Sequence, residues 1–122
     1  MDIGILLFDQ VDLLDFGGPY EVFLTASRLA RRAGGPAPFE VYTIGFDDRP
    51  VQAYGGVRLV PDRTVAEVET LDVLIVPGAI AIDEVAANGQ VPAAIDMLAQ
   101  RAGIVASVCT GAFLLARAGL LD

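Results

Sequence analysis

The chain has 122 residues, 54% of them hydrophobic, which suits one folded domain with a buried core. Its net charge is −8, and its eight basic residues are all arginines, with no lysine and no histidine. A P-loop and a Schiff-base enzyme need lysine, most metal sites use imidazole, and a nucleic-acid-binding face needs positive charge. The composition therefore argues against these four classes, and we expect no metal site and no nucleic-acid partner.

The same composition gives an expectation for location. No apolar run approaches the roughly 18 residues that a membrane span requires, and the start at Met1 lacks the basic stretch of a signal peptide. The single cysteine, Cys109, cannot form an internal disulfide, which fits a reducing compartment. We therefore expect a cytoplasmic protein that has no contact with a membrane.

The first half of the chain alternates between apolar strands and an amphipathic helix. Residues 3–8 are predicted to form a buried strand, and a helix should open at Gly17-Gly18-Pro19 and run to residue 33. Val22, Phe23, Ala26, Leu29, Ala30 and Ala33 recur there at helical spacing and are expected to face inward. A second strand is predicted at 39–44 and a hairpin at 51–60 around Gly55-Gly56. Asp62 or Thr64 should cap one helical turn before the next strand.

The second half continues this rhythm. A third buried strand is predicted at 73–76, followed by helices at 82–87 and 92–102, with Ala94, Ile95, Leu98 and Ala102 facing inward. A fourth strand at 103–108 should lead into a helix at 112–118, with Gly119 as its C-cap. Strands that alternate with helices predict an α/β fold, a mostly parallel sheet with helices on both faces, in one domain over residues 1–122.

Three loops after the predicted strands carry the chemistry of interest, at 9–15, 77–80 and 109–111. In open parallel sheets, ligands bind beyond the carboxyl ends of the strands. We therefore expect the three loops to converge on one pocket that takes a small-molecule substrate.

Cys109 is the sharpest signal among them. A residue at a tight strand-turn-helix junction points its side chain out of the sheet edge, and the following helix aims its unpaired amides at the sulfur. This spacing favours a reactive nucleophile. The alternative is that Cys109 is a small, buried apolar residue.

Asp15 is the second candidate, because it lies between Leu14 and Phe16. Apolar surroundings should raise the pKa of this carboxyl and let it carry a proton to or from the reacting group. The alternative is that Asp15 is the N-cap of the following helix.

The remaining candidates are backbone donors and a hydroxyl. The amides of Gly78 and Ala79 can form an oxyanion hole, or can belong to an ordinary Pro-Gly turn. Thr110 can donate its hydroxyl to an intermediate or cap the helix, and Gly111 leaves room for a substrate to approach the backbone.

Three ordered segments resemble a known superfamily: 14–23 (LDFGGPYEVF), 76–78 (VPG) and 107–116 (SVCTGAFLLA). They are similar to the ThiJ/PfpI superfamily, which has the flavodoxin-like, class I glutamine amidotransferase-like fold. The first and third resemble the isonitrile hydratase branch, and also the sensor domains of AraC-type regulators. Relatives continue with further C-terminal elements, so the resemblance implies an incomplete domain that a further segment or a second chain completes.

The resemblance implies a role for each site residue. Cys109 takes the place of the nucleophile, Asp15 that of its acidic partner, and Thr110 that of the assisting residue. Gly78, Ala79 and Ile80 match the loop on the oxyanion side. The implied reaction is hydration of an isonitrile to an N-substituted formamide, by a homodimer without metal or organic cofactor.

Other functions remain open. The same scaffold supports glyoxalase-like or deglycase chemistry, a ligand-sensing domain of a transcriptional regulator, and a redox sensor in which Cys109 is oxidised. The sequence shows no helix-turn-helix of its own. A phosphoacceptor receiver domain is rejected, because the chain has no lysine and no aspartate that ends the third strand.

Overall fold

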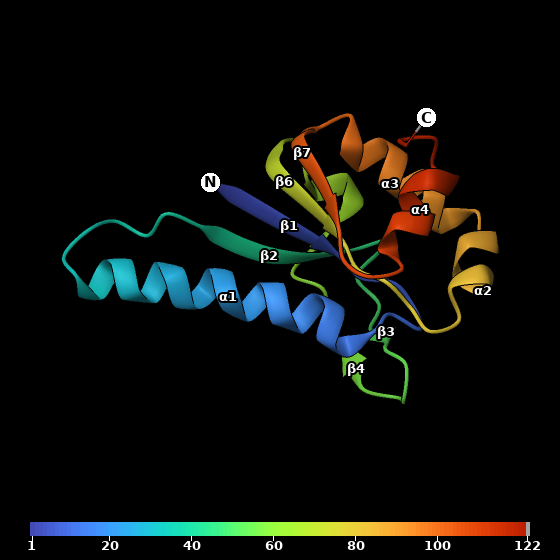
Figure 1. The fold of residues 1–122 in the computed structure, drawn as a ribbon, viewed down its shortest axis with the longest axis horizontal. Helices are drawn as coiled ribbons and strands as arrows, with labels where there is room; N and C mark the ends of the chain where they lie inside the picture. Colours follow the sequence, from blue (N-terminus) through green and yellow to red (C-terminus); the bar gives the residue numbers. More distant parts are fainter. Residues whose placement is uncertain (122) are drawn as a thin grey trace.

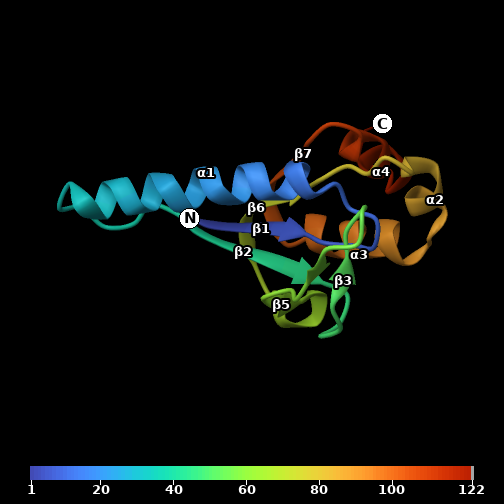
Figure 2. The same ribbon diagram turned by 90° about the horizontal axis from the view of Figure 1, so that it is seen from below.

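The computed structural model describes residues 1–121 and is built around a five-stranded parallel sheet in the order β5-β2-β1-β6-β7 (Figures 1 and 2). A separate antiparallel pair, β3 and β4, forms the predicted hairpin. The strands are β1 (Asp2–Leu6), β2 (Glu40–Gly45), β3 (Val51–Gln52), β4 (Arg58–Leu59), β5 (Arg63–Thr64), β6 (Leu71–Val76) and β7 (Ala102–Ser107). The helices are α1 (Leu13–Arg32), the 3-10 turn η1 (Val65–Glu67), α2 (Ile82–Ala87), α3 (Gln90–Ala99) and α4 (Gly111–Arg117).

Helices cover both faces of the sheet, which confirms the predicted α/β fold. Helix α1 lies along one face, and α3 and α4 lie on the other (Figures 1 and 2). The central strands β1 and β6 are almost continuously apolar and buried, as strands of a parallel sheet covered on both faces must be.

Helix α1 begins at Leu13, four residues before the predicted start. Its N-cap is Asp12, whose Oδ1 accepts a hydrogen bond from the amide of Leu14 at 3.1 Å, so the alternative that Asp15 is the N-cap is wrong. Pro19 consequently lies inside the helix, where it has no N–H to donate to the carbonyl of Asp15. The residue before the proline is Gly18, which has no Cβ to meet the proline ring, and the helix continues through it.

The face of α1 that packs on the sheet also differs from the prediction. Val22 is 64% exposed and Leu29 50% exposed, whereas Phe16 and Ser27 are buried. Ser27 is fixed by a polar contact: its Oγ donates to the carbonyl of Phe39 at 2.8 Å and accepts from the Phe39 amide at 3.1 Å. Phe23 packs against the core and Ala26 and Ala30 are half-buried, so the prediction is wrong for Val22, Leu29 and Ala33 only.

Smaller corrections concern the ends of elements. Helix α3 ends at Ala99, and Ala102, which was predicted to face inward from that helix, opens β7 instead. Ala94, Ile95 and Leu98 are buried as predicted. Thr64, rather than Asp62, is the N-cap of the short helical turn, where it contacts Glu67 in a capping box.

The end of α4 also differs slightly from the prediction. Its C-cap is Ala118, not Gly119. Gly119 is the next residue, at φ +81°, and its amide bonds the carbonyl of Ala116 at 3.0 Å. With the amide of Leu120 on the carbonyl of Leu115 at 3.0 Å, this closes a Schellman motif that glycine suits because it has no Cβ.

Strand β1 has β2 on one side and β6 on the other, so the chain winds in opposite directions from β1. The carboxyl ends of β1 and β6 therefore form a topological switch point, where α/β proteins place their ligands.

Among residues 1–121, no helix is long and apolar enough to cross a membrane.

Candidate active site

The loop after β6 is held against the start of α1 through both polar groups of one glycine. The carbonyl of Gly78 accepts from the amide of Asp12 at 2.9 Å, and its N–H donates to Oδ2 of Asp15 at 3.2 Å. Asp15 is the third residue of α1, a position from which an acidic side chain can reach back to the N-cap amide. Here the N-cap amide, that of Asp12, is already bonded to the carbonyl of Gly78. The carboxylate of Asp15 instead accepts from the amide of Gly78, on the other side of the switch point.

Asp15 is half-buried, and its pKa is raised above the ordinary value. Burial is the largest cause, and the negative charge of Asp12 adds to it. The hydrogen bond from Gly78 works in the opposite direction, because it stabilises the carboxylate. The raised pKa agrees with the expectation for a carboxyl beside apolar neighbours, and it suits a group that holds and releases a proton.

Thr110 ties the loop after β7 to the loop after β6. Its Oγ1 accepts from the amide of Ala79 at 3.1 Å and donates to the carbonyl of the same residue at 3.0 Å. Thr110 is the N-cap residue of α4 by position, but its side chain makes no capping hydrogen bond to that helix. Ala79 itself is 3% exposed and forms an isolated β-bridge with Val11.

Gly78 lies where Asp15 and Thr110 meet. A Cβ at this position would overlap Oγ1 of Thr110 and would lie 2.9 Å from the Thr110 amide and 3.0 Å from Oδ2 of Asp15. The absence of a side chain at Gly78 is therefore what lets the three loops come together.

Cys109 occupies the turn between β7 and α4 with a φ of +52°, and it is exposed. Among residues 1–121 only it and Gln10 have a positive φ without being glycine. This conformation is costly for a residue with a Cβ, and strain of this kind gathers at functional sites. Its exposure rules out the alternative that Cys109 is a buried core residue; its role as nucleophile stays a prediction.

Gly111 and Ile80 complete the predicted site. Gly111 is buried as the first residue of α4, and a Cβ there would overlap the carbonyl of Val76 and lie 2.9 Å from that of Pro77. It therefore permits close packing of α4 on the end of β6, and a role toward substrate stays a prediction. Ile80 is 63% exposed, next to the buried Ala79.

The two amides predicted as oxyanion donors both have partners within the chain. Gly78 N–H bonds Asp15, and Ala79 N–H bonds Thr110. To stabilise an oxyanion, either amide would have to exchange its present partner for the substrate. This pairing could not be predicted from the sequence, because the bonds join residues 63 and 31 positions apart.

Val11 and Asp12 were missed as part of the site. Both lie in the predicted loop 9–15 without a predicted role, yet their backbones hold the loop after β6 in place through the bridge to Ala79 and the bond to Gly78. An aspartate directly before the apolar start of α1 was the available signal, since that pattern marks an N-cap.

No group of three or more His, Cys, Asp or Glu side chains in residues 1–121 is arranged to hold a metal ion. The site as described consists of a thiol, a carboxyl, a hydroxyl and backbone groups.

Comparisons with known proteins agree with the resemblance that the motifs suggested. The chain is 38% identical over 120 residues to an "Uncharacterized protein in cpoL 5'region" of Streptomyces lividans, covering 98% of this chain and 81% of that protein. It is 35% identical to an isonitrile hydratase of Pseudomonas putida over 122 residues, which are all of this chain and 49% of that enzyme. It is 31% identical over 120 residues to the transcriptional regulator GbdR of Pseudomonas aeruginosa, covering 98% of this chain and 31% of that protein.

A solved structure shares the fold. A ThiJ/PfpI family protein from Pseudomonas syringae superposes with a TM-score of 0.79 at 24% identity, over 98% of this chain and 46% of that one. The chain therefore spans about half the length of the isonitrile hydratase and of this structural neighbour. The DJ-1/PfpI family model matches residues 1–122, and the chain belongs to the DJ-1/PfpI family.

Proposed function

We propose that this chain carries the catalytic half of a cysteine-dependent hydratase that converts an isonitrile into an N-substituted formamide. The observation that supports it best is the convergence of Asp15, Gly78 and Thr110 at the switch point, with Cys109 exposed on the adjoining strained turn. The 35% identity to an isonitrile hydratase supports the choice of substrate class.

In the proposed reaction, the sulfur of Cys109 bonds to the terminal carbon of the isonitrile, that carbon takes a proton from Asp15, and the thiol proton replaces it on Asp15. The product is a thioimidate in which the sulfur is bound to a CH=N group. Asp15 then gives its proton to the imine nitrogen and accepts one from water as the water oxygen attacks the same carbon. The C–S bond breaks, the sulfur takes the proton of the new hydroxyl group, and the N-substituted formamide leaves. The sum is addition of one water to the isonitrile, with no oxidant or reductant.

The raised pKa of Asp15 suits the first step, because a carboxyl must be protonated to act as an acid. Thr110 is proposed to assist by orienting the loop that carries Ala79. A homodimer and a cytoplasmic location stay predictions.

The test is incubation of the protein with phenyl isonitrile and quantification of N-phenylformamide by chromatography. Cys109→Ala should abolish turnover, and Asp15→Asn should lower it by roughly 10²–10⁴-fold. Glu21→Gln, on the exposed side of the same helix, is the matched control and should leave turnover unchanged. Turnover that survives in Cys109→Ala would contradict the proposal.

A second candidate is a ligand-sensing domain of a transcriptional regulator. The 31% identity to GbdR favours it. The amides of Gly78 and Ala79 are both bonded within the chain, which also favours it, because a site that only binds a ligand needs no free amides to stabilise an oxyanion. This candidate predicts saturable binding of a small molecule with no product and no dependence on Cys109.

Parallel incubations with methylglyoxal and with peroxide distinguish the remaining candidate functions. Consumption of methylglyoxal without conversion of phenyl isonitrile would favour glyoxalase-like or deglycase chemistry. A gain in mass on Cys109 with peroxide, without turnover of either compound, would favour a redox sensor.

A further inference from the structure

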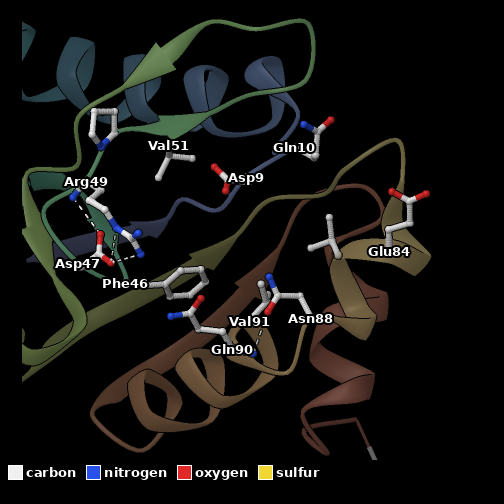
Figure 3. Close-up of a pocket in the computed structure, with 12 residues that line it drawn as sticks. Asp9, Gln10, Phe46, Asp47, Arg49, Val51, Glu84, Asn88, Gln90 and Val91 are labelled. Atoms are coloured by element: carbon white, nitrogen blue, oxygen red, sulfur yellow. Dashed lines mark hydrogen bonds and ion pairs between the residues drawn. The ribbon is translucent and has the colours of Figure 1, made fainter.

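A cavity that Cys109 does not line lies at the carboxyl ends of β1 and β2 (Figure 3). Its volume is about 390 Å³, within the range of small-molecule sites. Three segments enclose it: the loop after β1, the β2–β3 connection with the start of β3, and the α2–α3 region. None of the residues proposed above for the isonitrile reaction lines it.

The inner wall of this cavity is apolar. Val51, Val85 and Val91 are buried, and the ring of Phe46 is half-buried beside them. In Figure 3 the side chains of Phe46 and Val91 lie on one side of the space and those of Val51 and Asp9 on another. A ligand seated there would contact hydrocarbon and one aromatic face.

The rim is acidic. Three carboxylates, Asp9, Asp47 and Glu84, line the cavity together with one guanidinium, Arg49. Arg49 pairs with Asp47 at 2.7 Å, and this pairing is the main cause of the lowered pKa of Asp47. Within residues 1–121, Asp9 and Glu84 are in no ion pair. The cavity therefore presents a net negative charge that the chain does not neutralise.

Asp9 is held in place from the side of the hairpin. Its Oδ1 accepts from the amide of Gln52 at 3.0 Å, and the amide of Gln10 donates to the carbonyl of Gln52 at 2.8 Å. These bonds fix the loop after β1 on β3, with Gln10 at a φ of +73°. The second oxygen of Asp9 has no partner in the described part of the chain, so it can face a ligand without a change of structure.

We propose that this cavity binds a small organic cation, an ammonium group attached to an apolar body. The ammonium would lie at the acidic rim that Asp9 and Glu84 help to form, and the body would pack on Phe46 and the three valines. An aromatic ring also offers its negative face to a cation. A neutral molecule would leave the carboxylates uncompensated, and an inorganic cation would gain nothing from the apolar wall.

The test uses three probes that share one ring and differ in charge: benzylammonium, benzyl alcohol and benzoate. Binding to the isotopically labelled chain at pH 7 and low salt is followed by amide chemical shifts in NMR titrations. We expect benzylammonium to bind at least about 10-fold more tightly than benzyl alcohol, with shifts at the loop after β1 and at α2. Benzoate should give no localised shifts.

Variants then show which carboxylates contribute to the binding of benzylammonium. Asp9→Asn and Glu84→Gln should each weaken benzylammonium binding by about fivefold, which is the worth of one unit charge at 4 Å in water. The double variant should bind benzylammonium no better than benzyl alcohol. Asp83→Asn removes a neighbouring exposed carboxylate that does not line the cavity, and it should change nothing.

Three results would overturn the proposal: equal binding of benzylammonium and benzyl alcohol, an unchanged affinity in the double variant, or displacement of benzylammonium by millimolar calcium chloride. Calcium displacement would identify an inorganic cation site. Each variant is checked by its thermal melt, and Asn at position 9 keeps an oxygen that can accept from Gln52. The outcome is independent of whether the chain hydrates isonitriles, because no residue of that site is altered.

Discussion

The carboxylate of Asp15 accepts a hydrogen bond from the backbone N–H of Gly78, 63 positions further along the chain, at an N···O distance of 3.2 Å. With the bond from the Asp12 amide to the Gly78 carbonyl, it joins the start of α1 to the loop after β6. It fixes the acidic group at the switch point of the sheet, beside the turn that carries Cys109.

The raised pKa of Asp15 makes stability depend on pH. A folded-state pKa above the unfolded value of 3.8 means that the folded chain binds this proton more tightly. The contribution is therefore full below pH 3.8 and is lost as pH rises through the folded pKa. Asp15→Asn should raise the melting temperature relative to the parent chain at pH 7 and give no gain near pH 3.5, measured by thermal denaturation. Glu21→Gln serves as control, and a gain of equal size at both pH values would contradict the burial effect.

The hydroxyl of Thr110 should contribute more to the free energy of unfolding than its methyl group does. Thr110→Val removes both hydrogen bonds to Ala79 and leaves a buried amide and carbonyl without their partner, at a cost of about 1–3 kcal/mol in the free energy of unfolding. Thr110→Ser keeps the hydroxyl and should retain most of the stability. Urea denaturation measures both variants, and equal loss in the two would mean that the methyl group, not the hydroxyl, matters.

Gly78 should not tolerate a side chain. Gly78→Ala places a Cβ against Thr110 and Asp15, so we expect a loss of about 1–3 kcal/mol in stability and a displaced carboxylate. Gly17→Ala is the matched control, since nothing lies within 4 Å of a Cβ there. Inside α1 it should raise stability by about 0.5–1 kcal/mol. Equal melting temperatures for the two variants would show that the loop can move away from Gly78 at no cost.

The strained turn at Cys109 predicts a difference in stability between two variants, which can be measured without a substrate. With φ at +52°, Cys109→Gly relieves the cost of a Cβ, whereas Cys109→Ala keeps it. The glycine variant should therefore be about 1–2 kcal/mol more stable than the alanine variant, by chemical denaturation. The reverse order would mean that the turn relaxes to an ordinary φ in solution.

The expected homodimer can be tested on α1. An apolar stripe containing Leu14, Val22 and Leu29 is exposed along it. Antiparallel pairing of two copies would bring the acidic start of one helix toward the basic end of the other, at Arg31 and Arg32. Val22→Glu should convert the dimer to a monomer in sedimentation velocity. Leu24→Glu, at an exposed leucine on another side of the helix, should not; a monomeric parent chain would contradict the expectation.

The order of β1, β2, β6 and β7 and of the helices between them could be predicted from the sequence, because these strands are short apolar runs that alternate with helical patterns. Strand β5 was not predicted, because its two residues, Arg63 and Thr64, are polar. The three site loops could also be found this way, since each directly follows such a strand. Residues 82–87 were predicted with the bounds that α2 has. Local signals sufficed for these features, because they depend on neighbours within a few positions.

Tertiary structure alone decided how the site is connected. Ser27 packs inward because the backbone of Phe39 satisfies it, and Val22 faces outward because another stripe of α1 meets the sheet. Asp12 caps α1, which frees Asp15 to bond Gly78, and Thr110 bonds Ala79 instead of its own helix. In each case the local sequence allows more than one hydrogen-bond partner or buried face. Only the packing of segments that are distant in the sequence determines which one is within reach.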